Sequence, residues 1–174
     1  MRSYVDRSEP KFIVDENVIK LGRWLRMLGV DAAFYPISSD NELVRIAIRE
    51  NRIILTRDRH FLDRRVKCFL LKSSDPIEQL CQVIEEFGIE VSEERFLSRC
   101  LECNVPIEEV KDKTEIKDLV PPYVYKTQKR FYRCPKCGKI FWSGTHVRNM
   151  RKKLGPIIKK YSKGKGGLKD KAAS

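Results

Sequence analysis

Three aspartates in the first third of the chain stand at positions where carboxylates can carry out chemistry. Asp15 ends the apolar run KFIVD, Asp58 follows the apolar run RIILT, and Asp40 opens a helical segment. In an open parallel α/β sheet, ligands gather outside the carboxyl ends of the strands. We therefore expect Asp15, Asp40 and Asp58 to lie on one edge of a sheet, with Glu42 and Asp63 within reach as auxiliary acids.

Three converging carboxylates repel one another, so such a cluster is stable only when cations occupy it. Hard oxygen ligands favour Mg²⁺ or Mn²⁺, and ions of this kind activate water and stabilise the leaving oxygen of a phosphodiester. Neighbouring arginines suit phosphate groups. The arginines expected to hold a nucleic-acid backbone are Arg23, Arg57 and Arg59, with Arg26 as a further option.

Each of these acids also has a purely structural interpretation. Asp15, Asp40 and Asp58 can cap helices or turns, and taken singly that is the simpler reading. Their joint position at strand ends favours a metal site. His60 is open to two interpretations, as a metal ligand or acid/base group and as a surface histidine, and the second is favoured. His146 is expected to belong to a surface rather than to a zinc site.

Four cysteines form a second constellation in the last part of the chain. Two C-x-x-C pairs stand 30 residues apart, and four thiolates can surround a structural zinc ion tetrahedrally. Disulfides conflict with a reducing compartment, and a redox motif needs no second copy. We expect a zinc ribbon with a β-hairpin insertion and a tight turn at Gly138. The predicted zinc ligands are Cys100, Cys103, Cys134 and Cys137.

Positive charge is concentrated after residue 122. Residues 123–174 hold 16 Lys and Arg against one acid, Asp170, whereas residues 1–122 hold 20 basic and 23 acidic residues. A clustered basic surface with interleaved aromatic residues suits RNA, and Lys136 and Arg148 are predicted contacts. The alternative is a solvated tail that serves only solubility.

The elements expected to position these residues alternate between strand and helix. Gly22, inside the first helix, indicates a close approach by another backbone or a ligand, and Ser39 with Glu42 forms a capping signature. Alternation of this kind predicts an α/β domain with a mostly parallel sheet flanked by helices. The expected strands are 11–15, 31–36, 52–56 and 66–71, and the expected helices are 16–29, 38–51 and 73–88.

Three segments follow from these patterns: an α/β domain in 1–98, a zinc ribbon in 99–154, and a basic, disordered tail in 155–174. An apolar run of about 18 residues is absent, so no membrane association is expected. The first residues, MRSYVDRSEPKF, show no secretion signal, so we expect a cytoplasmic protein.

Three segments together resemble the Mut-seven C-terminal ribonuclease domain family, a branch of the PIN-like nucleases. They are FIVDENVIKLGRWLRMLGVD, SSDNELVRIAIRENRIILTRD, and RCLECNVPIEEV with YRCPKCGKIFWSGTH, and the resemblance covers about residues 11–154. It implies a PIN-like α/β fold with a fused zinc ribbon, and it assigns the acidic positions to Asp15, Asp40 and Asp58. Many PIN-like relatives carry another acid two residues after the last aspartate, and His60 stands there in this chain.

The resemblance implies a ribonuclease that hydrolyses RNA phosphodiester bonds with Mg²⁺ or Mn²⁺, while the ribbon and tail bind RNA. The departure at His60 leaves open whether one or two ions are used, and whether Asp63 substitutes for the missing acid. The alternative is a non-catalytic RNA-binding protein, associated with ribosomal particles, whose acidic site is degenerate. Because PIN-like domains often pair, a homodimer is also an option. A phosphatase on a doubly wound sheet fits less well, since the first strand is followed by DENVI rather than D-x-D-x-[TV].

Overall fold

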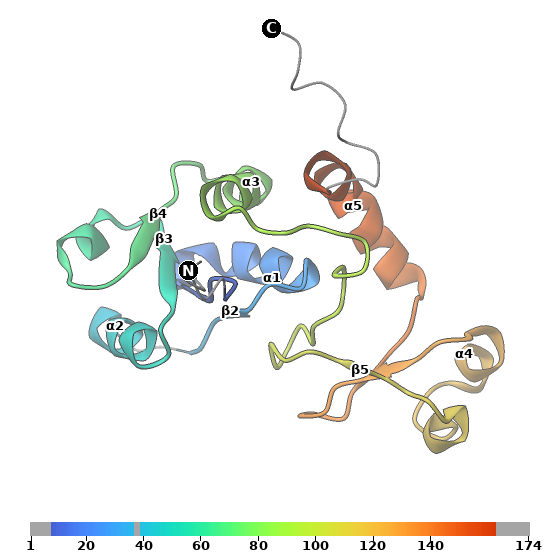
Figure 1. Cartoon of the computed structure of the whole chain (residues 1–174). Helices are drawn as coiled ribbons and strands as arrows, with labels where there is room; N and C mark the ends of the chain where they lie inside the picture. The colour runs from blue at the N-terminus through green and yellow to red at the C-terminus, as the bar shows by residue number, and fades with distance from the viewer. Residues whose placement is uncertain (1–7, 37–38, 163–174) are drawn as a thin grey trace, which may run out of the picture. The chain divides into compact units, whose positions relative to one another are not determined.

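The computed structural model describes residues 8–36 and 39–162. The chain divides into two compact units, residues 1–89 and 90–174, and each is considered by itself. Figure 1 labels the helices and several of the strands. The tail after residue 162, which the sequence predicts to be disordered, lies outside the described residues.

The first unit is built on a four-stranded sheet in which every strand pair is parallel. The strand order is β2-β1-β3-β4, so the first strand lies inside the sheet between the second and third. All three residues of β1 are buried, as expected of a strand covered on both faces. The predicted parallel α/β architecture is confirmed. The strands are β1 (Phe12–Val14), β2 (Ala32–Ala33), β3 (Ile53–Thr56) and β4 (Cys68–Leu70).

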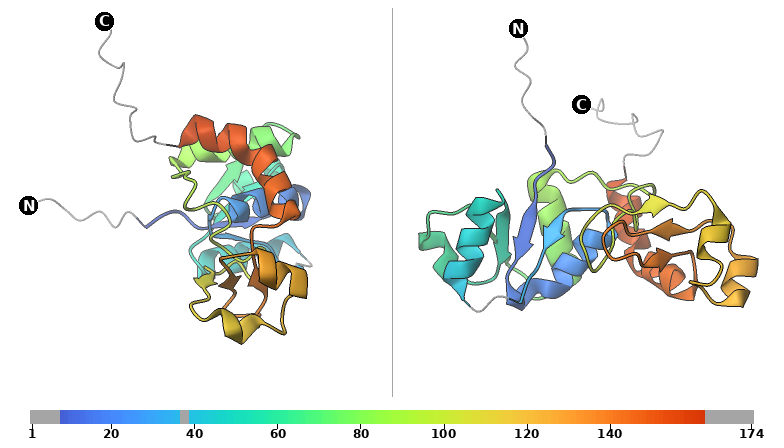
Figure 2. Two further views of the ribbon diagram at one scale, coloured as in Figure 1. Left: turned by 90° about the vertical axis from the view of Figure 1, so that its right-hand side faces the viewer. Right: turned by 90° about the horizontal axis from the view of Figure 1, so that it is seen from below.

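Helices cover both faces of this sheet. Figures 1 and 2 show α2 (Asp40–Arg49) on one face and α1 (Ile19–Met27) with α3 (Pro76–Phe87) on the other. The helix ends carry the expected signals. The Ser39 hydroxyl accepts a hydrogen bond from the Glu42 N–H at 3.3 Å, and Gly88 ends α3 with a left-handed φ of 59°. Short 3-10 turns η1 (Glu16–Val18) and η2 (Arg59–Asp63) follow β1 and β3.

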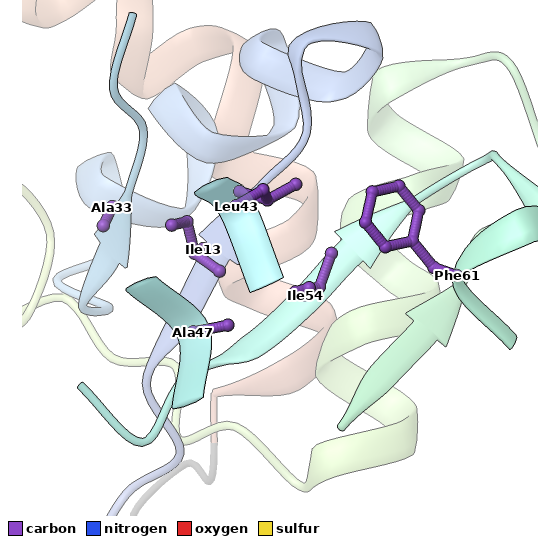
Figure 3. Close-up of a cluster of buried hydrophobic side chains, with 6 residues drawn as sticks. All are labelled: Ile13, Ala33, Leu43, Ala47, Ile54 and Phe61. Atoms are coloured by element: carbon purple, nitrogen blue, oxygen red, sulfur yellow. The ribbon is translucent and has the colours of Figure 1, made fainter. Parts of the chain in front are cut away.

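The face beneath α2 is closed by a compact apolar cluster. Figure 3 shows its six side chains converging from β1, β2, α2, β3 and η2. Because alternate residues of a strand point to opposite faces, β1 and β3 each place one side chain in this cluster. Its members are Ile13, Ala33, Leu43, Ala47, Ile54 and Phe61.

On the opposite face of the sheet, the close packing of α1 depends on a glycine in that helix. The rings of Phe12 and Phe87 meet edge to face with centroids 5.0 Å apart, which ties β1 to α3. On α1, a Cβ added at Gly22 would lie 2.9 Å from Val14 Cγ2 and 3.0 Å from Phe34 Cδ1. The close approach predicted at Gly22 is therefore present, and it is made by two side chains of the sheet rather than by a backbone or ligand.

The second unit contains a small antiparallel sheet with its own core. Its strands, in the order β5-β6-β7, are β5 (Glu108–Glu109), β6 (Tyr132–Arg133) and β7 (Ile140–Phe141). The buried cluster consists of Ile116, Val120, Phe131 and Ile140. Short antiparallel strands that carry a four-cysteine cluster are the arrangement of a zinc ribbon, so the predicted fold class is confirmed for this unit as well.

The insertion between the cysteine pairs differs from the expectation. The sequence predicts a β-hairpin there; the insertion carries the antiparallel strand pair β5–β6 at its two ends, but η3 (Lys113–Ile116) and helix α4 (Pro122–Thr127) stand between these strands. The Asp112 carboxylate caps η3 by accepting from the Thr114 N–H at 3.0 Å, and Pro122 occupies the first turn of α4, where its missing N–H is not needed. These two local signals outweigh the β-propensity of the nearby valines and tyrosines, Val120, Tyr123, Val124 and Tyr125.

Residues 155–161 also depart from the expected disordered tail, because they belong to helix α5 (Thr145–Tyr161). Pro156 lies inside this helix, and Figure 2 shows α5 as two segments that meet at an angle. Proline removes one helical hydrogen bond and bends the axis without ending the helix. Within the described part of the chain, no helix is long and apolar enough to cross a membrane.

Candidate functional site

A buried threonine joins two of the three predicted acids. Thr56, the last residue of β3, is fully buried. Its hydroxyl donates to Asp15 Oδ2 at 2.8 Å and accepts from the Asp58 backbone N–H at 2.9 Å. The adjacent parallel strands β1 and β3 thus place Asp15 and Asp58 on one edge of the sheet. Asn17 reinforces the link by donating to Asp15 Oδ2 at 3.0 Å.

Asp58 holds His60 in a fixed orientation. The Asp58 Oδ1 atom accepts from the His60 backbone N–H at 2.9 Å and lies 2.7 Å from its Nδ1. The backbone hydrogen bond is the largest cause that lowers the pKa of the Asp58 carboxyl below its ordinary value, followed by the ring hydrogen bond and by the charges of His60 and Arg64. The His60 side chain is 86% exposed. Asp58 is therefore a carboxylate near neutral pH, and the histidine beside it faces solvent.

Asp40, the third predicted acid, is contacted by Arg64, an arginine that is not among the predicted site residues. Asp40 is the first residue of α2, and the Arg64 Nη2 atom lies 3.9 Å from its Oδ2. Arg64 Nη1 also donates to Asn41 Oδ1 at 2.6 Å. Arg64 follows η2, so its guanidinium connects the segment after Asp58 with the start of α2. The contact is tertiary and spans 23 positions, and no local pattern in the sequence signals it.

Asp15, Asp40 and Asp58 are not grouped as closely as the predicted three-carboxylate metal site. Within residues 8–36 and 39–162, the four cysteines are the one group of three or more His, Cys, Asp or Glu side chains disposed to hold a metal ion. Asp15 and Asp58 nevertheless offer the carboxylate oxygens that Mg²⁺ and Mn²⁺ prefer, hydrogen-bonded to neighbours that orient them. This donor set fits a hard divalent ion, while the assignment of Asp15, Asp40 and Asp58 as its ligands stays a prediction.

The arginines predicted to bind phosphate differ in their environments. Arg57 and Arg59 flank Asp58 and are exposed, and Arg23 is exposed on α1. Arg26, by contrast, is only 3% exposed. Its Nε donates to the Ala32 carbonyl oxygen at 2.7 Å, and its guanidinium stacks 3.6 Å from the Phe34 ring centroid. Arg26 is therefore committed to holding α1 against β2, which removes it from the phosphate-binding candidates.

The four cysteines of the second unit form a compact group. Their sulfur atoms all lie within 4.8 Å of one another, and the Sγ atoms of Cys100 and Cys137 are 4.0 Å apart. Zinc–sulfur bonds of about 2.3 Å give a tetrahedron with sulfur–sulfur edges of roughly 3.8 Å. The thiols therefore have the composition and spacing of a structural zinc site. His146, exposed on α5, lies outside the group.

Backbone amides prepare the cysteine group for a metal. The N–H groups of Lys136 and Cys137 each donate to Cys134 Sγ at 3.4 Å, and the Cys103 N–H donates to Cys100 Sγ at the same distance. Burial raises the pKa of the Cys134 thiol, but the amide donors together with the Cys137 and Cys100 side chains bring it down to about 7, whereas burial raises the pKa of the Cys100 thiol and raises that of Cys103 to about 12. Gly138 supports the turn with a φ of 75°, as predicted. Amide donors that favour thiolate are what a closed zinc site requires.

The basic surface of the second unit is exposed, but most of its aromatic residues are not. Lys136 and Arg148, the predicted RNA contacts, are both exposed. Phe131 is 2% exposed and packs against Trp142, so it forms core rather than a stacking surface for bases. The aromatic side chain most open to solvent is Tyr123 on α4, at 76% among the described residues.

A parallel α/β domain with acids at its strand ends, followed by a four-cysteine ribbon, defines a class of nuclease-like proteins fused to a zinc module. A model of the Mut7-C RNAse domain matches residues 10–154. The chain belongs to this family, which confirms the predicted resemblance and implies a ribonuclease that acts on RNA. A comparison with curated proteins returns no match.

Proposed function

We propose that this protein is a divalent-metal-dependent ribonuclease that hydrolyses RNA phosphodiester bonds at the edge of the β1–β3 sheet. The acidic centre comprises Asp15 and Asp58, with Asp40 on the α2 side. A bound Mg²⁺ or Mn²⁺ supplies an activated water and offsets negative charge on the phosphate. The attacking water would lose a proton as its oxygen bonds to phosphorus, the bond to the leaving oxygen would break, and that oxygen would take up a proton, so no net proton is consumed in the bond exchange.

The observation that carries this proposal is the shared hydroxyl of Thr56. A fully buried side chain donates to the Asp15 carboxylate and accepts from the Asp58 backbone N–H, which ties together the ends of β1 and β3 that carry the two acids. A divalent ion bound by acids at these strand ends would be held by the hard oxygen ligands that it prefers. Each acid also caps the 3-10 turn that follows its strand, since Asp15 accepts from the Glu16 N–H and Asp58 accepts from the His60 N–H.

RNA binding is supported by the charge of the second unit. Residues 123–162 contain 12 Lys and Arg and no Asp or Glu. Some of these cations have acidic partners from residues 90–122, such as Arg130 with Glu109 and Lys139 with Glu102. On α5, Lys152, Lys153 and Lys159 are exposed and extend the basic surface beyond Arg148. Several exposed cations on one helix suit a phosphate backbone.

The decisive experiment replaces the charge at one acid without changing its shape. Asp58→Asn keeps a side-chain acceptor for the His60 N–H but removes the negative charge, so we expect RNA cleavage with Mn²⁺ to be abolished while the melting temperature is preserved. Glu86→Gln, an exposed acid on α3, is the matched control and should cleave like the unmodified protein. Cleavage by the Asp58→Asn protein at the normal rate would rule out this centre.

The second candidate function is RNA binding without cleavage, favoured by the same basic surface. It predicts salt-sensitive RNA binding, no cleavage with any divalent ion, and unchanged affinity in the Asp58→Asn protein. The cleavage assay described above separates the two candidates, because a protein that binds RNA tightly and never cuts it supports the second.

A further inference from the structure

We propose that Tyr123 is a stacking platform for one base of single-stranded RNA, and that the insertion between the two cysteine pairs presents it. This inference rests on the RNA-binding part of the proposed function and deepens it, because it names the form of RNA that the second unit selects and a residue that touches a base. It depends neither on cleavage nor on a divalent ion.

Tyr123 keeps a large aromatic side chain in solvent. The residue is 76% exposed. Among the described residues, its ring takes part in no aromatic pair and no cation–π contact, whereas the ring of Tyr125 on the same helix lies 4.5 Å from Lys113 Nζ. Aromatic side chains usually bury most of their surface on folding. An aromatic ring that stays in solvent is available to a partner.

The insertion holds Tyr123 at a defined place. Pro122 opens α4, and the Tyr125 N–H donates to the Pro121 carbonyl oxygen at 2.9 Å. The Thr127 hydroxyl donates to the Tyr123 carbonyl oxygen, also at 2.9 Å. Tyr125 packs against the buried cluster of the second unit, which anchors the helix. The backbone is therefore fixed, and only the two side-chain torsions of Tyr123 have to be ordered when a base binds.

The charge around Tyr123 favours RNA over an apolar protein partner. Residues 119–133 contain four Lys and Arg and no Asp or Glu. Lys126 is exposed and stands three residues after Tyr123, so the two side chains share one face of α4. Among the described residues, neither Lys126 nor Lys129 forms an ion pair. An exposed aromatic ring with a cation on the same face is the combination that binds the base and the phosphate of a nucleotide.

A ring of this kind selects unpaired RNA. The bases of a duplex cover one another, and an A-form helix presents mainly its backbone and hydroxyl groups, so a tyrosine stacks only on a base that is unpaired. Stacking is tolerant of sequence, because every base has a π-face. The exposed cations of α5 attract RNA of either form. Tyr123 therefore adds discrimination in favour of a single strand or a loop, without a fixed sequence.

The test compares binding of the zinc-loaded full chain to a short single-stranded RNA and to a duplex of the same sequence, without added Mg²⁺ or Mn²⁺. Fluorescence anisotropy gives the affinities. Tyr123→Ala should weaken single-strand binding about 10-fold, as expected for the loss of one stacked base. It should leave duplex affinity and the salt dependence of binding unchanged, because no phosphate contact is lost. Tyr123→Phe should bind like the unmodified protein. Tyr123→Leu, which keeps apolar surface without a ring, should bind like the alanine variant.

Leu119→Ala is the matched control, since it removes another exposed apolar side chain from the insertion and should leave single-strand affinity unchanged. Lys126→Gln should weaken single-strand binding and make it less sensitive to salt. Zinc content shows that the second unit is folded in every variant. Unchanged single-strand affinity in Tyr123→Ala, an equal loss of duplex affinity, or normal binding by Tyr123→Leu would each overturn the inference.

Light scattering tests the other occupant of this surface, a second copy of the chain. A dimer of the unmodified protein that Tyr123→Ala dissociates would assign Tyr123 to a protein interface and overturn the inference. The ribonuclease proposal is judged separately, by cleavage with Mn²⁺. The expected affinity changes without any cleavage would support the stacking role and refute the nuclease, while normal cleavage with unaltered affinities would do the reverse.

Discussion

At the scale of single residues, Thr56 shows how one buried hydroxyl can organise a site. A hydroxyl carries one hydrogen to donate and lone pairs to accept, and Thr56 uses both functions on neighbouring strand ends. The oxygen itself is shielded from water. Thr56 therefore adds to the β1–β3 pairing in positioning Asp15 and the backbone of Asp58.

Thr56→Val is expected to impair both stability and activity. Valine has nearly the same shape but removes the hydrogen bonds to Asp15 Oδ2 and to the Asp58 N–H, each of which contributes about 0.5–1.5 kcal/mol of unfolding free energy. Cleavage should fall with it, because the two acids are no longer held together. Urea unfolding and RNA cleavage measure the two effects, and Thr56→Ser, which keeps the hydroxyl, should restore most of both. Equal activity in the valine and serine proteins would contradict this role.

Part of the site could be predicted from the sequence, for a clear physical reason. Asp15 and Asp58 follow apolar runs directly, and parallel strands bring their carboxyl ends to one edge. Arg64 could not be found in this way, because its contacts join segments whose proximity depends on the packing of α2. Arg26 was a phosphate candidate by composition alone, and only its burial against Phe34 excludes it.

At the scale of the elements, the packing of α1 onto the sheet depends on the absence of one methyl group. Gly22→Ala should gain up to about 1 kcal/mol from helix propensity. It would also place a Cβ 2.9 Å from Val14 Cγ2, and overpacking of this kind typically costs 1–3 kcal/mol. We expect a net loss of stability, measured as a lower midpoint in urea unfolding.

A double-mutant cycle separates steric conflict from other effects of the alanine. Val14→Ala removes the nearest methyl group and costs stability by itself, since Val14 is buried. Combined with Gly22→Ala, it should give a double mutant more stable than the sum of the single effects predicts. Strict additivity would show that the contact between α1 and β1 is not the source of the loss.

The elements of the first unit were predictable because their signals are local. Apolar runs, the Ser39 cap and the final Gly88 all lie within the segments that they define. The second unit was harder to predict. The insertion contains tyrosines and valines suited to strands, yet the Asp112 cap and the proline in the first turn of α4 favour a 3-10 turn and a short helix. Gly155 and Pro156 indicate the end of a helix, but buried Leu154, Ile157 and Ile158 carry α5 past them.

At the scale of the whole molecule, the predicted divalent-ion site and the predicted zinc site belong to different units, and these units also differ in charge. The acidic candidates all lie in residues 1–89, and the cysteine group lies in residues 90–174 with the strongly basic segment. The domain boundaries expected at residues 98 and 154 stay a prediction. The separation has a practical consequence, since each metal can be removed while the other unit is observed.

Loss of zinc is expected to unfold the second unit selectively. A small sheet of two-residue strands has little core, so metal binding supplies much of its folding free energy. Cys134→Ser, or a strong chelator, should abolish zinc binding and make residues 90–162 sensitive to protease, while residues 8–89 persist as a resistant fragment. Mass spectrometry of the fragments and zinc analysis provide the measurement.

The control for zinc loss is Cys81→Ser, which alters a cysteine outside the metal group on α3. It should retain one zinc ion per chain and the protease pattern of the unmodified protein. Full resistance of residues 90–162 in the Cys134→Ser protein would show that the second unit folds without its metal.

The helical insertion has a consequence for the solubility of the ribbon. Ile116 and Val120 from the insertion cover Phe131 and Ile140, which belong to the hairpin side of the same cluster. A shorter linker between Cys103 and Cys134 would spare every thiolate and still leave those two side chains facing water. Exposed apolar surface of that kind promotes self-association. The length of the insertion is thus a requirement for keeping the ribbon monodisperse, quite apart from its capacity to hold metal.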